Sequence, residues 1–139
     1  MVHALEEVRR TLVPEGVLID LRPMAGRWPV EVTSDRSRHP IGWLQDLPDE
    51  LADSKAANIA IKEAARRGWF VRESKQSFRF SYYWDTPEEM REFIREEWSG
   101  FTELEEEAFS TTQNAWAGAG TDRRVRVQIR MHLARWRKR

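Results

Sequence analysis

Two polar side chains that could orient a ligand follow an apolar segment near the N-terminus. Asp20 and Arg22 lie at the end of the segment 17–21, Val-Leu-Ile-Asp-Leu. In open α/β sheets ligands collect at the carboxyl ends of the strands, where a carboxylate and a guanidinium can hold a polar molecule. The simpler interpretation, an internal ion pair or a solvated strand end, is favoured because a single motif is weak evidence. Asp20 and Arg22 are still the ligand-binding candidates at this strand end, beside the favoured interpretation of an ion pair or a solvated strand end.

Aromatic side chains form a second candidate site for an apolar or cationic ligand. The alternative is packing in the core or at an interface, which is the usual fate of aromatic residues on one face of a strand. That alternative is favoured strongly for Phe78 and Phe80 and less strongly near the strand end. The predicted ligand-binding aromatic residues are Trp28, Trp43, Tyr82 and Trp84.

Residues for catalysis or metal binding are scarce. The chain has no cysteine, which excludes disulfides, thiol nucleophiles and thiolate metal sites. His3, His39 and His132 lie on different predicted elements, without the spacing of metal ligands. His39 could act as a general base beside Asp35, but a histidine at a hairpin tip is usually solvated. No catalytic residue and no metal site are predicted.

The charge pattern argues against nucleic-acid and membrane partners. The 23 basic residues balance the 23 acidic ones among 139 residues, and the basic segment 123–139 is offset by the acidic segment 85–107. Because its arginines alternate with apolar residues, we expect them to form ion pairs within the fold. No apolar run approaches the roughly 20 residues of a membrane span, and no signal-peptide pattern occurs at the N-terminus. The expectation is a soluble, cytoplasmic protein of one domain, residues 1–139.

The first half of the chain must supply the elements that position Asp20 and Arg22. Helical spacing of apolar residues predicts a helix over 3–13, ended by Pro14 and a turn at Gly16. The nearly continuous apolar run 17–21 is typical of a strand buried on both faces. A hairpin is expected within 24–48, and a helix over about 50–67 that ends at Gly68 and packs closely through alanines.

The second half predicts two long strands separated by helices. Residues 77–84 alternate with period two, and this strand extends back to residue 69 or 70. Asp85-Thr86-Pro87-Glu88-Glu89 is a helix start, and a second helix covers about 103–117. The terminal strand 124–136 has one apolar face, with a basic outer face opposite. The apolar residues of that strand are Val125, Val127, Ile129, Met131 and Leu133.

The segment ALEEVRRTLVPEGVLIDLRP resembles part of the Rossmann-like, S-adenosylmethionine-dependent methyltransferases. Those enzymes often carry a helix, then Leu-x-Pro-Gly-Gly, then an apolar strand. Here Leu12-Val13-Pro14-Glu15-Gly16 precedes the apolar run, with Glu15 in place of the usual first glycine. The later order of helices and strands is similar to the second half of that fold. The resemblance implies an α/β fold with a mixed sheet of about four to six strands and helices packed on it. It also implies that strand 124–136 lies between strands 17–21 and 69–84, with 17–21 central in the sheet.

The glycine-rich loop with which that family binds its cofactor has no counterpart in this sequence. The resemblance therefore implies a non-catalytic module that binds a small ligand or a protein partner, without a cofactor of its own. One alternative is a methyltransferase that binds S-adenosylmethionine through a half supplied by another chain; the other is an unrelated α+β binding protein or enzyme. Because the strand Val17–Leu21 would lack a neighbour, we expect a homodimer that covers this edge.

Overall fold

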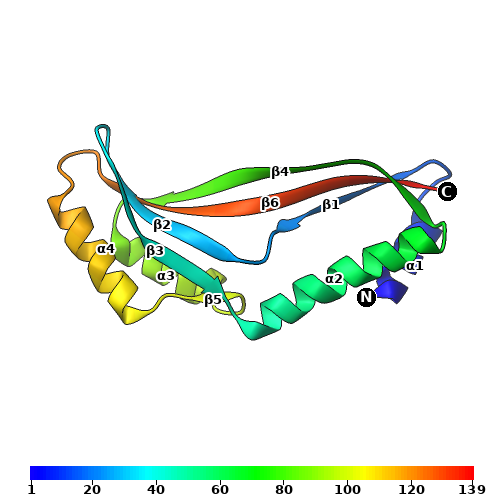
Figure 1. The fold of residues 1–139 in the computed structure, drawn as a ribbon, viewed down its shortest axis with the longest axis horizontal. Coiled ribbons are helices and arrows are strands. Elements are labelled where there is room, and N and C mark those ends of the chain that lie inside the picture. Colours follow the sequence, from blue (N-terminus) through cyan, green and yellow to red (C-terminus); the bar gives the residue numbers. More distant parts are fainter. The chain divides into compact units, whose positions relative to one another are not determined.

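A computed structural model describes all residues, 1–139, and confirms the α/β class. Six antiparallel strands form one sheet, and four helices accompany it (Figure 1). The helices are α1 (Val2–Thr11), α2 (Pro48–Arg66), α3 (Pro87–Glu97) and α4 (Glu106–Gly118). The strands are β1 (Val17–Pro23), β2 (Arg27–Thr33), β3 (Arg38–Asp46), β4 (Phe70–Trp84), β5 (Thr102–Glu103) and β6 (Arg124–Lys138). No helix is long and apolar enough to cross a membrane.

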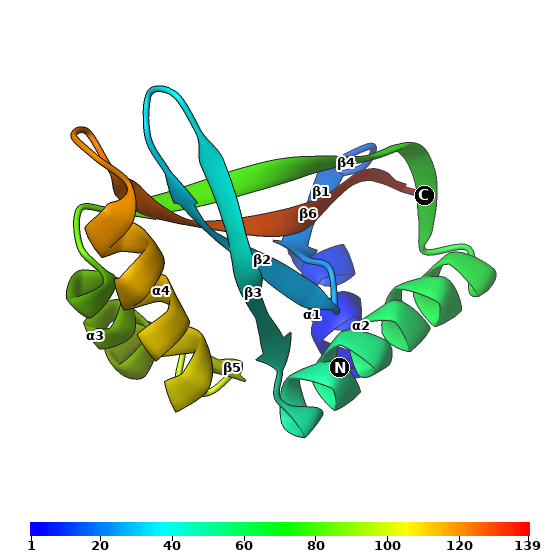
Figure 2. The same ribbon diagram turned by 60° about the vertical axis from the view of Figure 1, so that its left-hand side comes forward.

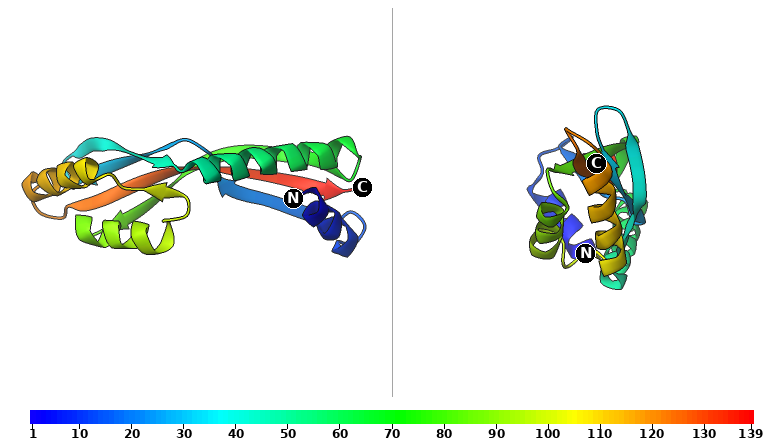
Figure 3. Two further views of the ribbon diagram at one scale, coloured as in Figure 1. Left: turned by 90° about the horizontal axis from the view of Figure 1, so that it is seen from below. Right: turned by 90° about the vertical axis from the view of Figure 1, so that its left-hand side faces the viewer.

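The chain divides into two compact units, each built from segments that are far apart in the sequence. The terminal unit comprises Met1–Met24, Leu51–Phe78 and Arg130–Arg139, and it contains both chain termini (Figure 3). The central unit comprises Ala25–Glu50 and Arg79–Ile129. The strands β4 and β6 each contribute residues to both units.

In the terminal unit, β6 pairs with β1 and with β4. The β1–β6 pairing is antiparallel and runs from Val17 opposite Arg137 to Pro23 opposite Met131. This order, with β6 between β1 and β4, is the predicted one. The prediction that β1 is central is wrong, because β1 pairs with β6 alone and forms an edge of the sheet.

Helices α1 and α2 supply the apolar side chains that cover one face of these strands. The core consists of buried residues from α2, β4 and β6, and α1 packs against it through partly buried side chains. The alanines of α2 permit this close approach, as their number in the sequence predicted. The buried residues are Ile61, Ala64, Phe70, Ala134 and Trp136, and the side chains packed on them include Leu5, Val8, Leu12 and Leu18.

The turn between α1 and β1 explains the Pro-x-Gly motif that precedes the strand. The Gly16 N–H donates to the Val13 carbonyl at 2.9 Å, and a Cβ atom on Gly16 would lie only 2.8 Å from that same oxygen. Glu15 adopts a left-handed conformation with φ 60°, which favours glycine. Its carboxylate lies 3.3 Å from Arg137 on β6. Glu15 therefore occupies a backbone position that suits glycine, and its side chain contacts the last strand.

The central unit contains the predicted hairpin. Strands β2 and β3 pair antiparallel, and the Ser34 N–H donates to the Ser37 carbonyl at 2.9 Å in the turn between them. β2 also pairs with β6, and the short β5 pairs antiparallel with the end of β3. α4 packs against β3 and β2, and α3 lies beside α4 (Figure 2).

Helix α3 begins where the sequence predicted. Thr86 is its N-cap, and its hydroxyl accepts a hydrogen bond from the Glu89 N–H at 3.2 Å. The Glu89 carboxylate in turn accepts a hydrogen bond from the Asp85 N–H at 3.0 Å. Met90 and Ile94 point from this helix into the core. The second predicted helix starts three residues later than expected, at Glu106, and buries Phe109 and Thr112.

Several apolar residues predicted to be buried are exposed. In β1 the even-numbered side chains are partly buried, whereas Ile19 and Leu21 are 54% and 55% exposed, so the strand is not buried on both faces. Phe78 and Phe80, which were expected to pack in the core or at an interface, are 41% and 47% exposed and so do not lie in the core.

Candidate functional site

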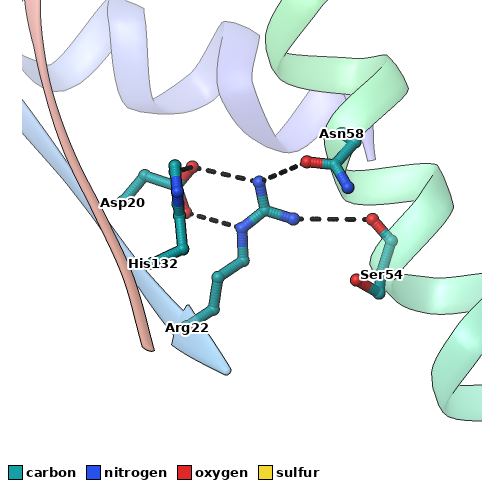
Figure 4. A network of polar contacts seen from close by, with 5 residues as sticks. All are labelled: Asp20, Arg22, Ser54, Asn58 and His132. Atoms are coloured by element: carbon teal, nitrogen blue, oxygen red, sulfur yellow. Dashed lines mark hydrogen bonds and ion pairs between the residues drawn. The ribbon is translucent and has the colours of Figure 1, made fainter. Parts of the chain in front are cut away.

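Asp20 and Arg22 lie together in the terminal unit, in the ion pair that was the favoured interpretation. Arg22 Nε donates to Asp20 Oδ1 at 2.8 Å, and a second guanidinium nitrogen donates to Oδ2 at 3.2 Å (Figure 4). Alternate residues of a strand point to the same face, so a spacing of two places both side chains beside one another. The two side chains are only 17% and 21% exposed, which strengthens the pair relative to one in open solvent.

Arg22 also joins β1 to α2. Its Nη2 donates to the Asn58 side-chain carbonyl at 2.9 Å, and its Nη1 lies 3.5 Å from the Ser54 backbone carbonyl (Figure 4). The guanidinium is thus surrounded by acceptors from two elements. Its planar group with several fixed donors suits this arrangement, which a lysine could not reproduce.

His132 completes this network, and the sequence analysis missed it. Its Nε2 lies 3.4 Å from Asp20 Oδ2, and its side chain is 15% exposed. The residue is the direct cross-strand neighbour of Arg22 on β6. The alternation of β6 had placed His132 on a solvated basic face. A signal for His132 was nevertheless present. Asp20 and Arg22 lie at alternate positions on one face of β1, and a strand that pairs with β1 is expected to place a polar side chain beside them.

The network can orient polar groups, but its own members already satisfy one another. Both Asp20 oxygens accept contacts, from Arg22 and from His132. A ligand at this site would have to replace one of these partners or bind to the side of them. The geometry supports a structural tie between β1, β6 and α2, and it leaves ligand binding by Asp20 and Arg22 as a prediction.

A groove of about 250 Å³ opens beside this network, within the terminal unit. Its walls are mostly apolar and come from α1, β1 and α2. Asp20 and Arg22 contribute the charged groups among its lining residues. The apolar lining includes Ala4, Leu5, Leu18, Ala57, Ala60 and Ile61.

The edge of β1 beside the groove carries unpaired backbone groups. Gly16 accepts a hydrogen bond from Lys138 of β6 at 2.8 Å, and Met24 donates one to Arg130 of β6 at 2.7 Å. Even-numbered residues of this strand therefore direct their backbone groups toward β6. Backbone direction alternates along an antiparallel strand, so Val17, Ile19 and Leu21 direct their N–H and C=O groups away from the sheet. These outward groups have no strand partner, because β1 pairs only with β6.

The aromatic candidates lie in the central unit, where three of them pack together. Trp28 is 4% exposed and contacts Trp98 edge-on, with ring centroids 5.3 Å apart. Tyr82 stacks on Trp84 at 5.9 Å and meets Trp98 at 4.9 Å. These contacts are those of a packed aromatic cluster. The structure therefore gives Trp28, Tyr82 and Trp84 a packing role, and their binding of a ligand stays a prediction.

Trp43 is separate from that cluster. Its side chain is 52% exposed, and the Arg27 guanidinium lies 5.4 Å from its ring centroid. Such a cation–π contact at an exposed site is worth about 0.5–1 kcal/mol. Trp43 is therefore available on the surface of the central unit, without aromatic neighbours that would form a pocket with it.

A second buried ion pair lies in the central unit. Arg126 on β6 is 5% exposed and donates from Nε to Glu31 on β2 at 2.8 Å, and the two residues are direct cross-strand neighbours. Burial lowers the pKa of Arg126, but hydrogen bonds with Glu31 and Tyr83 outweigh it, and the net pKa is raised. Arg135 likewise contacts Glu73 at 2.8 Å in the terminal unit. The expectation that the arginines of β6 pair within the fold is confirmed for these residues.

Asp46, at the end of β3, is a carboxylate whose environment disfavours its charged form. Burial raises the pKa of Asp46, and the hydrogen bond that its Oδ2 accepts from the Gly26 N–H, at 2.6 Å, partly opposes that rise. Its Oδ1 is buried without a partner. The residue lies in the hairpin region of the central unit and has no titratable neighbour with which it could exchange a proton in the contacts observed.

No group of three or more His, Asp or Glu side chains is arranged to hold a metal ion. His3 contacts only Glu6 on α1, and His39 is exposed on β3. Comparison with known proteins gives no further assignment: no family model, no curated protein and no solved structure matches the chain. The methyltransferase resemblance therefore stays a prediction, and function must be inferred from the geometry of the site.

Proposed function

We propose that this chain is a non-catalytic interaction module that assembles with a second copy through the free edge of β1. The observation that carries the proposal is the edge itself. Val17, Ile19 and Leu21 direct unpaired backbone groups outward, and the Ile19 and Leu21 side chains are more than half exposed beside them. Strand edges of this kind are templates for pairing with another chain.

The network around Asp20 supports a protein partner in preference to a polar small molecule. The acceptors and donors of Asp20 and Arg22 are occupied within the chain, so the strand can approach another strand without exposing an unpaired charge. The groove beside β1 offers further apolar surface to the same partner. Apolar contact combined with backbone hydrogen bonding is the usual basis of strand addition. The module would be derived from a methyltransferase and act in the cytoplasm.

The oligomeric state tests the proposal directly. We expect light scattering after size-exclusion chromatography to give the mass of a dimer at micromolar concentration. Ile19→Lys should give the monomer, because it places a positive charge on each of the two edge strands, and such charges oppose strand pairing. The matched control is Ile59→Lys, since Ile59 is 58% exposed on α2 and the substitution is the same. A monomeric wild-type protein, or equal behaviour of the two variants, would reject the proposal.

A second candidate is a methyltransferase completed by another chain, and the same free edge favours it. In that case the partner would supply both the missing neighbour of β1 and the loop that binds S-adenosylmethionine. Calorimetric titration separates the candidates. Binding of S-adenosylmethionine to the isolated chain would contradict the first proposal, and binding only in the presence of a partner would support the second.

A further inference from the structure

We propose that the two β1 strands pair antiparallel in one register, with the two-fold axis at Ile19. This inference rests on the proposed homodimer and specifies its interface. In this register Ile19 lies opposite Ile19 of the second copy, and Val17 lies opposite Leu21. Three features of β1 select it: the direction of its backbone groups, the position of Pro23 and the position of Asp20.

The backbone direction limits the pairing to a few registers. The outward N–H and C=O groups belong to odd-numbered residues, as the hydrogen bonds of Gly16 and Met24 with β6 establish. A two-fold axis perpendicular to the sheet keeps each side chain on its own face, so odd-numbered residues must lie opposite odd-numbered residues. The axis then passes through Ile19, Asp20 or Leu21 if the pairing is to use most of the strand.

Pro23 distinguishes these three registers. As an odd-numbered residue it faces outward, and it has no N–H to donate, which is the usual placement of proline on an edge strand. An axis at Asp20 would place Val17 opposite Pro23, and an axis at Leu21 would place Ile19 opposite Pro23. Either register leaves a carbonyl without its donor. With the axis at Ile19, every outward N–H and C=O group from Val17 to Leu21 meets a partner.

Charge selects the same register. An axis at Asp20 would bring the two Asp20 carboxylates directly opposite one another, and like charges in that position are destabilising. With the axis at Ile19, Asp20 faces Leu18 of the second copy and keeps its contacts with Arg22 and His132. Arg22 then lies opposite Gly16 of the second copy, so no like charge faces it.

Apolar contacts on the exposed face agree with this register. The odd-numbered side chains of β1 share one face of the strand, and Ile19 and Leu21 are its exposed members. Pairing at Ile19 places two isoleucines in contact at the axis and a valine against a leucine on each side of it. Such cross-strand pairs contribute roughly 0.2–1 kcal/mol each.

Single-cysteine variants test the register, because the chain has no cysteine of its own. Residues directly opposite in a hydrogen-bonded pair have Cα atoms about 5.5 Å apart, which a disulfide can span. We therefore expect Ile19→Cys to form a covalent dimer under mild oxidation. Leu21→Cys should remain mostly uncrosslinked, since its mate in the second copy would lie about 13 Å away along the strand. An equimolar mixture of Val17→Cys and Leu21→Cys should crosslink between the two variants.

The control is Ile59→Cys, an equally exposed position on α2 that should give only background crosslinking. Non-reducing electrophoresis reads the products, and circular dichroism confirms that each variant is folded. If Leu21→Cys crosslinks in preference to Ile19→Cys, the register is wrong while the homodimer stands. If the wild-type protein is a dimer and no β1 variant crosslinks, the copies meet elsewhere and the inference is overturned. A monomeric wild-type protein would overturn the proposed function itself.

Discussion

Strand β6 belongs to both units, and each unit buries a different set of its residues. In the central unit the odd-numbered Val125, Val127 and Ile129 are at most 4% exposed. In the terminal unit the buried residues are the even-numbered Ala134 and Trp136, whereas Met131 and Leu133 are only partly buried. The alternation in sequence is continuous from 125 to 133, but the alternation in burial is not. Apolar periodicity therefore predicts that a strand exists more securely than it predicts which face is covered.

The two units also place their buried ion pairs differently. In the central unit Arg126 pairs across strands with Glu31. In the terminal unit Asp20 and Arg22 pair along one strand, and His132 and Asn58 add partners from β6 and α2. The central pair depends on a single carboxylate, while the terminal network distributes its contacts. The two arrangements should therefore respond differently to the loss of one member.

The largest expected effect is in the central unit. Arg126→Ala should destabilise the protein by about 3–5 kcal/mol, because it leaves the half-buried Glu31 carboxylate without its partner. Arg124→Ala is the control, since Arg124 is on the same strand and its contact with Asp85 is exposed; we expect a loss below about 0.5 kcal/mol. Urea unfolding measures both. A loss below about 1 kcal/mol for Arg126→Ala would mean that the pair is not effectively buried.

The difference in burial along β6 predicts the next largest effect. Val127→Ala in the central unit should cost about 2 kcal/mol, since Val127 is 0% exposed and the change creates a cavity. Leu133→Ala in the terminal unit removes more atoms but should cost less, about 1 kcal/mol, because Leu133 is only partly buried. Chemical denaturation of the two variants gives the comparison. The reverse order of losses would show that Leu133 is covered in solution, as an interface between copies on that face would require.

Two glycines provide a smaller test, one in each unit. Gly16→Ala in the terminal unit should destabilise by about 1–3 kcal/mol, as its Cβ would lie 2.8 Å from the Val13 carbonyl oxygen. Gly42→Ala in the central unit has nothing within 4 Å of the new Cβ, and we expect a change within about 0.5 kcal/mol. The melting temperatures of the two variants, measured by thermal unfolding, should therefore differ. Equal melting temperatures would indicate that the turn before β1 can relax.

The smallest expected effect depends on pH and concerns Asp46. Because burial raises the pKa of Asp46, the folded state binds its proton more tightly than the unfolded state does. This contribution to stability is fully present below the unfolded pKa and is lost as the pH rises through the folded pKa. The stability of the wild type relative to Asp46→Asn should therefore be higher in acid and decline as the pH rises above the ordinary Asp range.

Urea unfolding at a series of pH values measures that difference. The matched control is Asp53→Asn, the same substitution at an exposed carboxylate on α2. A wild-type advantage that grows with pH would contradict the expected sign and would indicate that the Gly26 hydrogen bond outweighs burial.

Much of the fold follows from local sequence patterns. The helix start at Thr86, the stop at Gly68, the hairpin turn at Ser34–Ser37 and the two long strands all depend on residues close together in the chain, and all are present. What the sequence could not predict depends on pairing between distant segments. The apolar side chains of Ile19, Leu21, Phe78 and Phe80 suit a core, and only the tertiary arrangement leaves them exposed.

The candidate site was predicted only in part, because some of its contacts are local in the chain and others depend on pairing between distant segments. Asp20 and Arg22 are two residues apart on one strand, so their proximity could be inferred locally. His132 is more than one hundred residues away and joins them only through the register of β1 with β6. The aromatic candidates share a cluster because β4, α3 and β2 converge, which no spacing in the sequence indicates.

A further edge strand of the sheet, β4, limits how an assembly can grow. β4 pairs only with β6, and all of its residues from 72 to 80 are exposed. This stretch contains Arg72, Lys75 and Arg79. Positive charges along an edge strand oppose the addition of another strand. If copies join at β1, as proposed, these charges oppose the addition of a further strand at β4. We therefore expect a dimer in solution that resists growth into fibrils. Salt that screens these charges, or substitutions that remove them, should weaken that resistance.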